Sequence, residues 1–290
     1  MKKILFSGAC TALVTPFLGT QVNFPMLERL LQRQLDAGIR AIVLGGTTGE
    51  SPTLSDKEKL EIYRRGKEFV GDEAKIICGT GSNDTAHAVE LSMRAEQTGA
   101  DALLVVTPYY NKANPEGMYA HYLAIANAVS IPIILYNVPG RTGVDIPVSL
   151  CQRLSRIPNI AGIKEASNDI VKVSRIRLAC GSDLPIWSGN DDQAVSAMAL
   201  GAQGVISVLS NVMPVKTAAM ANAALAGDFD TAAELQCSML PLIDALFSEV
   251  NPIPVKAAMA MIGYDCGDCR LPLGPLAKKH EDALYKLLKA

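Results

Sequence analysis

The sequence predicts an α/β protein built as a closed (β/α)8 barrel, a TIM barrel, and two regularities carry that prediction. The first is a recurrence of short apolar segments rich in β-branched residues, each followed by a helical pattern. They start roughly 20 to 35 residues apart, which leaves room for a strand, a helix and two loops. The eight segments are GACTALVTPF (8–17), AIVLGGTTGE (41–50), KIICGTGSN (75–83), ALLVVTPYYN (102–111), PIILYNVPG (132–140), IAGIKEAS (160–167), PIWSGND (185–191) and GVISVLSN (204–211).

The second regularity lies between these segments, where apolar residues recur at helical spacing. MLERLLQRQLDAGIR and TAHAVELSMRAEQTGA place apolar residues at i, i+3, i+4 and i+7, as amphipathic helices do. Gly38, Gly99 and Gly201 precede the second, fourth and eighth segments, where glycine relieves a left-handed helix cap. The rival architecture, an open doubly wound sheet, favours a GxGxxG turn after its first strand, and here that strand ends TPFLGTQ.

We expect residues 1–227 to form the barrel and residues 228–290 to form a helical C-terminal extension. Three helical patterns follow the eighth unit: DTAAELQCSMLPLIDALF, PIPVKAAMAMIG and KKHEDALYKLLKA. Packing against the barrel wall and contact between subunits are enough to explain their residue types. A chain of 290 residues can fold in this way as one large domain with an appendage.

Composition favours a globular protein with small-molecule partners. The net charge is −2, with 27 basic and 29 acidic residues intermixed, so we expect no nucleic-acid partner. We expect no membrane association either, because no apolar run approaches the roughly 20 residues of a membrane span. The opening MKKILFSGACTALVTPF resembles a signal peptide superficially, but Ser7, Gly8 and Thr11 interrupt its apolar run.

The seven cysteines indicate a reducing compartment, so the cytoplasm is the expected location. Their number is odd and most lie within apolar segments, unlike a disulfide framework. Cys266 and Cys269 have the spacing of a metal or redox pair, but a zinc site needs further ligands nearby and only His280 follows. His87 and His121 fall in helical patterns, where we expect them on the helix surface. We therefore predict no metal site and no cofactor.

Barrel enzymes place their chemistry at the carboxyl ends of the strands, and Lys164 lies at such an end. It closes the apolar run Ile-Ala-Gly-Ile, where strand residues alternate between the inside and the outside of the barrel. An exposed lysine, or one paired with Glu165, is the ordinary alternative. The catalytic interpretation is an amine desolvated by the barrel walls, whose pKa falls from about 10.4 toward neutrality so that it attacks a carbonyl.

A Schiff-base mechanism also needs a proton shuttle and a grip on substrate carboxylates, and candidates for both are present. Tyr136 is a candidate acid or base with Thr47 and Tyr110 as a relay, although core packing is the commoner role of a lone strand tyrosine. Thr48, in the glycine-rich GGTTGE turn before a helix, is a candidate for cradling a carboxylate. Arg141 in PGRTG has a planar guanidinium that can bind a second carboxylate through two hydrogen bonds. An ordinary surface arginine is an equally good interpretation.

Five motifs occur in order along the chain: GTTGES (46–51), TPYYN (107–111), YNVPGRTG (136–143), GIKEAS (162–167) and GVISV (204–208). Through them the whole chain resembles the 4-hydroxy-tetrahydrodipicolinate synthase family, formerly called dihydrodipicolinate synthase. GTTGES and YNVP-x-RTG together separate this family from sialic-acid lyases and keto-deoxy-sugar aldolases, which share the barrel and its lysine. The implied reaction condenses pyruvate with aspartate 4-semialdehyde, the first committed step towards diaminopimelate and lysine.

The resemblance implies catalytic roles. Lys164 matches the lysine that forms the imine with pyruvate, and Tyr136 matches the tyrosine that shuttles protons during imine formation and cyclisation. Thr47 matches the threonine that links this tyrosine into a relay. Tyr110 matches the tyrosine that completes the relay from the neighbouring subunit, which makes a dimer the minimal competent unit. Members of the family are usually homotetramers, arranged as dimers of dimers.

The resemblance implies substrate contacts as well. Thr48 matches a contact to the pyruvate carboxylate, and Arg141 matches the arginine that receives the semialdehyde carboxylate. Gly189 and Ile206 match backbone contacts at the mouth of the barrel.

Many relatives are inhibited by lysine bound between subunits, and the matching positions here depart from the sensitive pattern. Positions that agree with it are Ser51, Asn83 and Tyr109, and positions that differ are Asp56, Lys59 and His87. Asp56 and Lys59 replace histidines, and His87 replaces the glutamate that holds the ligand's ammonium. Losing that acceptor costs a charge-assisted hydrogen bond of about 1.5–3 kcal/mol, so we predict weak or absent inhibition by lysine.

Three other functions compete with this one. Another pyruvate-dependent aldolase, such as N-acetylneuraminate lyase, shares the scaffold, and Arg141 in the RTG motif is the feature that disfavours it. A catalytically idle barrel requires a broken site, whereas every residue of the proposed site is present. A phosphate-binding barrel needs a glycine-rich cradle after the last two strands, and SGNDD and SVLSN offer only part of one.

Overall fold

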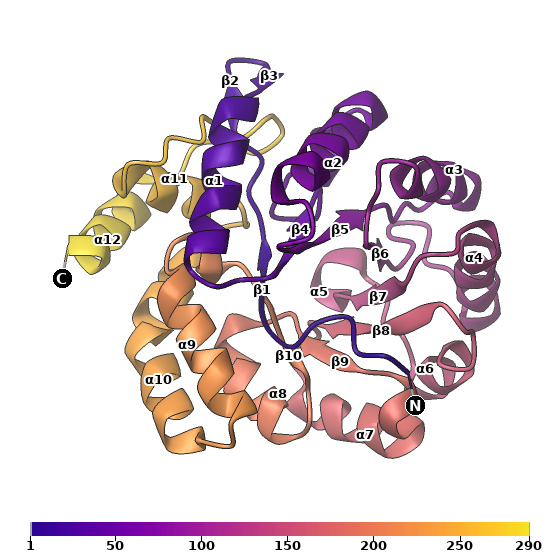
Figure 1. Ribbon diagram of the computed structural model, residues 1–290. Coiled ribbons are helices and arrows are strands. Elements are labelled where there is room, and N and C mark those ends of the chain that lie inside the picture. Colours follow the sequence, from indigo (N-terminus) through magenta and orange to yellow (C-terminus); the bar gives the residue numbers. More distant parts are fainter. Residues whose placement is uncertain (1, 290) are drawn as a thin grey trace.

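Eight parallel strands close into a barrel in the computed structural model, which describes residues 2–289 (Figure 1). Their order around the barrel is β1-β10-β9-β8-β7-β6-β5-β4, so consecutive strands are neighbours throughout. Each of the eight predicted segments supplies one strand of the barrel. The predicted barrel is therefore confirmed, and the alternative of an open doubly wound sheet is wrong. The strands are β1 (Gly8–Ala12), β4 (Ala41–Leu44), β5 (Lys75–Gly79), β6 (Ala102–Val106), β7 (Ile133–Asn137), β8 (Ile160–Glu165), β9 (Ile186–Ser188) and β10 (Gly204–Ser207).

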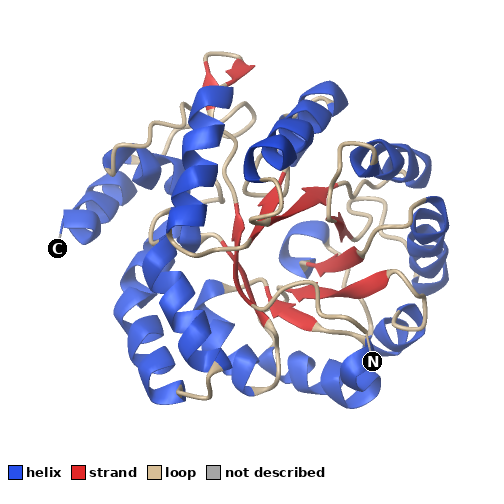
Figure 2. Ribbon diagram, in the orientation of Figure 1, coloured by secondary structure: helices blue, strands red, loops and turns tan. Residues whose placement is uncertain are grey.

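Helices surround this barrel (Figure 2). They are α1 (Phe24–Asp36), α2 (Asp56–Val70), α3 (Thr85–Glu96), α4 (Pro115–Ala128), α6 (Val148–Leu154), α7 (Ile170–Cys180), α8 (Ala194–Ala199) and α9 (Pro214–Leu225). The short α5 (Pro139–Thr142) is seen instead within the ring of strands (Figure 1). Gly38, Gly99 and Gly201 have φ angles of 80°, 86° and 96°, as the predicted left-handed caps require. A small hairpin of β2 (Phe17–Leu18) and β3 (Gln21–Val22), which the periodicity did not predict, follows β1.

Three further helices follow the barrel and lie beside it near α9 and α1 (Figure 1). They are α10 (Phe229–Leu246), α11 (Ile253–Met261) and α12 (Lys278–Lys289), and each coincides with one predicted helical pattern. The long α10 packs along α9, while α12 contacts both α10 and α11.

One helical prediction is wrong, because His121 is buried rather than on the surface of α4. Its Nδ1 lies 2.9 Å from the Thr85 hydroxyl on α3, and burial lowers its pKa to about 4. Small and apolar residues occupy several faces of α4, so its periodicity does not single out the face that meets α3.

Alternation along the strands fills the barrel with side chains. The inward-facing cluster includes Cys10, Val43, Ile77, Leu104, Ile134, Tyr136, Trp187 and Ile206. Phe6, just before β1, stacks on Trp187 with 4.8 Å between ring centroids, and the Trp187 indole N–H donates to the Phe6 carbonyl. Aromatic packing thus occupies the interior close to the amino-terminal segment.

A buried ion pair joins the loop after β4 to the C-terminal extension. Lys256 Nζ, on α11, lies 2.9 Å from Glu50 Oε1, and the two side chains are 3% and 0% exposed. Lys256 also donates to the Asp268 carbonyl at 3.0 Å, and the Arg270 backbone N–H donates to Glu50 Oε2 at 2.8 Å. Because Glu50 ends the GGTTGE turn, the extension holds that turn against the barrel.

We predict that Lys256→Met destabilises the fold, because it leaves the Glu50 carboxylate buried without its counter-charge. The free energy of unfolding should fall by about 3–5 kcal/mol in urea denaturation at neutral pH. Lys278→Met, which removes an exposed ammonium from α12, should change it by no more than about 1 kcal/mol. Equal effects of the two substitutions would contradict this account.

Candidate active site

Lys164 lies on β8 and its side chain is inside the barrel, as predicted. It is 5% exposed, and its Nζ lies 4.4 Å from the centroid of the Tyr136 ring. The two residues are paired in the parallel register of β7 and β8, so backbone hydrogen bonding brings them together. The predicted nucleophile and the predicted proton shuttle are therefore neighbours.

Gly189, immediately after β9, makes room for the lysine. A Cβ atom at this position would lie 2.9 Å from Lys164 Cε and 2.6 Å from the Ala166 Cβ. Its backbone N–H donates to the Glu165 carbonyl at 2.7 Å, so the turn cannot retreat without losing that bond. Ile206 is buried on β10 in the same interior cluster.

A buried carboxylate, which the sequence pattern did not single out, interacts electrostatically with Lys164. Asp191 follows β9, and its Oδ2 accepts the backbone N–H groups of Val208 and Leu209 at 2.9 and 3.0 Å. Burial raises the pKa of Asp191, while Ser207, the two N–H groups and Lys164 oppose that rise. The NDD tripeptide after the seventh strand was the only sequence signal for it.

A cavity of about 790 Å³ opens beside this pair. Its lining includes Thr47, Tyr136, Arg141 and Tyr110, but within residues 2–289 it includes neither Lys164 nor the other predicted substrate contacts. Tyr136 lies between Lys164 and the cavity, because its ring packs over the Lys164 ammonium and also forms part of the cavity wall.

The three predicted relay hydroxyls share this cavity without bonding to one another. Across the described chain, no hydrogen bond joins Tyr136, Thr47 and Tyr110. Tyr110 has a φ angle of 72° and is 89% exposed, so its ring lies largely in solvent. A left-handed backbone costs a bulky residue about 1–2 kcal/mol, so the surrounding structure must stabilise this conformation of Tyr110.

Asn251, from the extension, links the two predicted carboxylate contacts. Its side-chain Nδ2 donates to the Thr48 hydroxyl oxygen at 3.0 Å, and its backbone carbonyl accepts from Arg141 Nη2 at 3.2 Å. The Thr48 oxygen thus accepts from Asn251, which leaves its own proton for another acceptor. Sequence reasoning missed Asn251, because nothing in its neighbourhood along the chain marks it.

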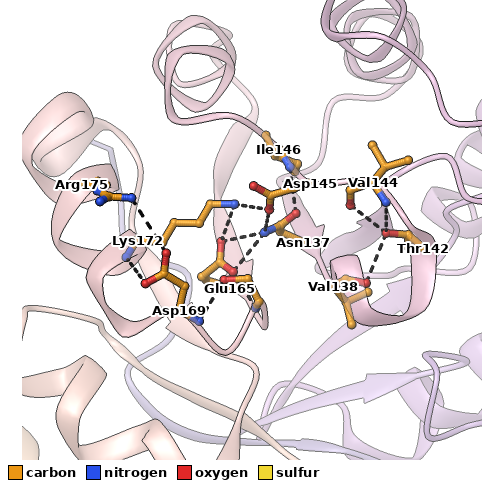
Figure 3. Close-up of polar contacts among 11 residues, drawn as sticks. Asn137, Val138, Thr142, Val144, Asp145, Ile146, Glu165, Asp169, Lys172 and Arg175 are labelled. Atoms are coloured by element: carbon orange, nitrogen blue, oxygen red, sulfur yellow. Dashed lines mark hydrogen bonds and ion pairs between the residues drawn. The ribbon is translucent and has the colours of Figure 1, made fainter.

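A polar network, buried at Asn137, Glu165 and Lys172 and exposed at Asp145, lies on the outer side of the same two strands (Figure 3). Asn137 Nδ2 donates to both Glu165 carboxylate oxygens at 3.0 Å and to Asp145 Oδ1 at 2.8 Å, while the Ile146 N–H donates to Asn137 Oδ1. Lys172 contacts Asp145 and lies 3.6 Å from Glu165 Oε2. Burial raises the pKa of Glu165, and the charge of Lys172 opposes that rise. The network fastens the segment carrying Arg141 to β7 and β8.

All six positions of the predicted regulatory site line the cavity as well. They are Ser51, Asp56, Lys59, Asn83, His87 and Tyr109. His87 Nε2 lies 2.9 Å from Asp56 Oδ2, so two of the three departures from the lysine-sensitive pattern are partners of each other.

Within residues 2–289, His, Cys, Asp and Glu side chains do not gather in threes as metal ligands would, and Cys266 and Cys269 are free thiols. In the same part of the chain no helix combines the length and the apolar character needed to cross a membrane.

Known proteins resemble this chain over its full length. Residues 5–290 match the profile described as the Dihydrodipicolinate synthetase family. The 4-hydroxy-tetrahydrodipicolinate synthase of Acetivibrio thermocellus is 46% identical over 289 residues, covering 100% of this chain and 98% of the relative.

Solved structures agree. The dihydrodipicolinate synthase of Aquifex aeolicus has a TM-score of 0.96 at 41% identity, covering 98% of this chain and 97% of its own. The enzyme of Cyanidioschyzon merolae, solved with lysine bound, has a TM-score of 0.96 at 37% identity and covers 99% of this chain and 98% of its own. With sequence and structure in agreement over the whole barrel, the chain belongs to the Dihydrodipicolinate synthetase family.

Proposed function

We propose that this chain is a lyase that condenses pyruvate with L-aspartate 4-semialdehyde to give 4-hydroxy-tetrahydrodipicolinate, on the route to diaminopimelate and lysine. The observation that carries the proposal is the buried Lys164 amine under the Tyr136 ring, at the carboxyl end of a barrel strand. N-acetylneuraminate lyase activity is not favoured, since the full-length relatives bear the synthase name.

Lys164 supplies the nucleophile for an imine with pyruvate. Its unprotonated amine attacks the ketone carbon, and the oxygen leaves as water once it has received protons. Loss of a proton from the methyl group of the imine gives an enamine, whose carbon attacks the aldehyde of the semialdehyde. The amino group of the second substrate then attacks the imine carbon, which closes the ring and releases Lys164.

Tyr136 is the proposed proton donor and acceptor in these steps. Its position over the lysine places its phenol at the boundary between the Lys164 end of the barrel and the cavity. Thr47 and Tyr110 line the same cavity, and we propose that they relay protons to and from Tyr136.

Thr48 and Arg141 are proposed to bind the carboxylates of the two substrates. The Thr48 hydroxyl accepts from Asn251 and so can donate its own proton to the pyruvate carboxylate. Arg141 uses one nitrogen for the Asn251 carbonyl, and its exposed guanidinium retains other N–H groups for the semialdehyde carboxylate. Gly189 and Ile206 are proposed to add backbone contacts at the mouth.

We further propose that Tyr110 acts in the neighbouring subunit and that the enzyme is a cytoplasmic homotetramer, a dimer of dimers. The exposed ring and the left-handed backbone of Tyr110 support this, because the residue points outward from its own chain at some cost. In this proposal the barrel, residues 1–227, carries the catalytic side chains. The extension, residues 228–290, braces the substrate contacts through Asn251 and the GGTTGE turn through Lys256.

The imine is tested by trapping it. Borohydride added with pyruvate should leave a reduced pyruvate adduct on the peptide containing Lys164, detected by mass spectrometry. Lys164→Ala should carry no adduct, and Lys75→Ala, at the amino end of β5, should carry the wild-type amount. Absence of an adduct from the wild-type protein would remove the proposed chemistry.

Subunit sharing is tested by complementation between Lys164→Ala and Tyr110→Phe. Each variant alone should be nearly inactive, but a denatured and renatured equal mixture should recover about a quarter of wild-type activity. About half of the random dimers are hybrids, and each hybrid holds one site with both residues intact. If Tyr110 serves its own chain, no site is intact and the mixture stays inactive.

Inhibition by lysine should be weak or absent. His87 offers no carboxylate to the ammonium of the ligand, and the Lys59 ammonium repels it. In initial-rate assays His87→Glu should lower the half-inhibitory lysine concentration at least about tenfold. Wild-type inhibition at tens of micromolar would contradict this prediction.

A further inference from the structure

One asparagine closes the loop of residues 138–146, the Arg141 loop, at both of its ends. Asn137 is the last residue of β7, so the loop begins at its backbone. Its side chain binds the far end: Nδ2 donates to Asp145 Oδ1 at 2.8 Å, and Oδ1 accepts the Ile146 N–H at 3.0 Å (Figure 3). Asn137 is 0% exposed, so water does not compete for these hydrogen bonds.

The orientation of the Asn137 amide is fixed from the barrel. Glu165 is its partner in the register of β7 and β8 and accepts from Nδ2 through both carboxylate oxygens at 3.0 Å. If the amide were turned over, its carbonyl would face the Glu165 and Asp145 carboxylates, and its N–H groups would face the Ile146 N–H. Lys172 contacts Asp145 and lies 3.6 Å from Glu165 Oε2, so its charge allows both carboxylates to approach one amide.

Arg141 lies in the middle of this closed loop. Its backbone N–H donates to the Val138 carbonyl at 2.9 Å. The Thr142 hydroxyl lies 3.2 Å from the Val138 carbonyl oxygen and 2.8 Å from that of Val144. These contacts fold the loop on itself, and the Asn137 side chain attaches its far end to the barrel.

We propose that Asn137 is a positioning residue for the second substrate: by closing the Arg141 loop, it places the Arg141 guanidinium where the semialdehyde carboxylate binds. This inference rests on the proposed function, in which Arg141 has that role. A two-bond contact between a guanidinium and a carboxylate needs the arginine backbone in one place. Lys164 faces the opposite side of β8 from Glu165, so imine formation with pyruvate should not depend on the loop.

Initial rates with Asn137→Ala test the inference. The kcat/KM for the semialdehyde should fall at least about fivefold, because the released loop carries Arg141 in several positions. Borohydride trapping of pyruvate without the second substrate should stay within about twofold of wild type. Arg175→Met, which removes an exposed cation from α7 beside the network, should match wild type in both measurements.

A double variant shows whether Asn137 acts through Arg141. When Asn137→Ala is added to Arg141→Ala, the kcat/KM for the semialdehyde should fall by no more than about a further twofold, because the positioned group is already gone.

Asp145→Ala tests the same loop from its far end. The Asp145 side chain is 51% exposed, and the substitution removes one hydrogen bond to Asn137 while leaving that of Ile146. We expect it to fold and to lower the kcat/KM for the semialdehyde in the same direction by a smaller factor. It therefore decides the question even if Asn137→Ala does not fold.

Hydrogen exchange measured by mass spectrometry examines the loop without any substrate. The peptide containing Ile146 should exchange faster in Asn137→Ala than in wild type, whereas peptides of β10 should exchange alike in both proteins.

Three results would overturn the inference. They are an unchanged kcat/KM for the semialdehyde in Asn137→Ala, an equal loss of pyruvate trapping in that variant, and an undiminished loss when Asn137→Ala is added to Arg141→Ala. These results would leave the proposed function intact. Wild-type protein that forms no pyruvate adduct would remove the proposed function and the inference together, so the two failures are distinguishable.

Discussion

The site depends on a lysine side chain held inside a close-packed barrel. Parallel register places Lys164 beside Tyr136, and the missing side chain of Gly189 gives it space. An ammonium in such an interior is costly unless charge or π-electron density faces it, and here the Tyr136 ring and the buried Asp191 meet that need. In these surroundings the amine is largely kept away from bulk water.

Because side chains alternate between the two faces of a strand, adjacent residues of β7 and β8 have different roles. Tyr136 and Lys164 face inward, whereas Asn137 and Glu165 face outward and join each other and Lys172 in a buried network. That network holds the segment that carries Arg141. The inner pair carries the proposed chemistry, and the outer pair holds the segment of a proposed substrate contact, so two consecutive residues on each of two strands have different roles.

The C-terminal extension is part of the site rather than an addition to the barrel. Asn251 reaches Thr48 and Arg141, and Lys256 neutralises Glu50 at the end of the GGTTGE turn. Both links join residues about 110 to 210 positions apart in the chain. The two proposed contacts to substrate carboxylates therefore depend on a segment that contributes no proposed catalytic side chain.

Sequence alone determined the periodic features of this protein. Apolar segments of even spacing and glycine caps predict eight strands with helices between them, and alternation in IAGIKEAS predicts that Lys164 turns inward. The motif order predicts the family. Only the tertiary structure decided that Asn251 bridges Thr48 and Arg141, that Asp191 is buried near Lys164, and that His121 is buried. The physical reason is that periodicity reports which face of one element is apolar, whereas these three properties depend on which distant elements meet that face.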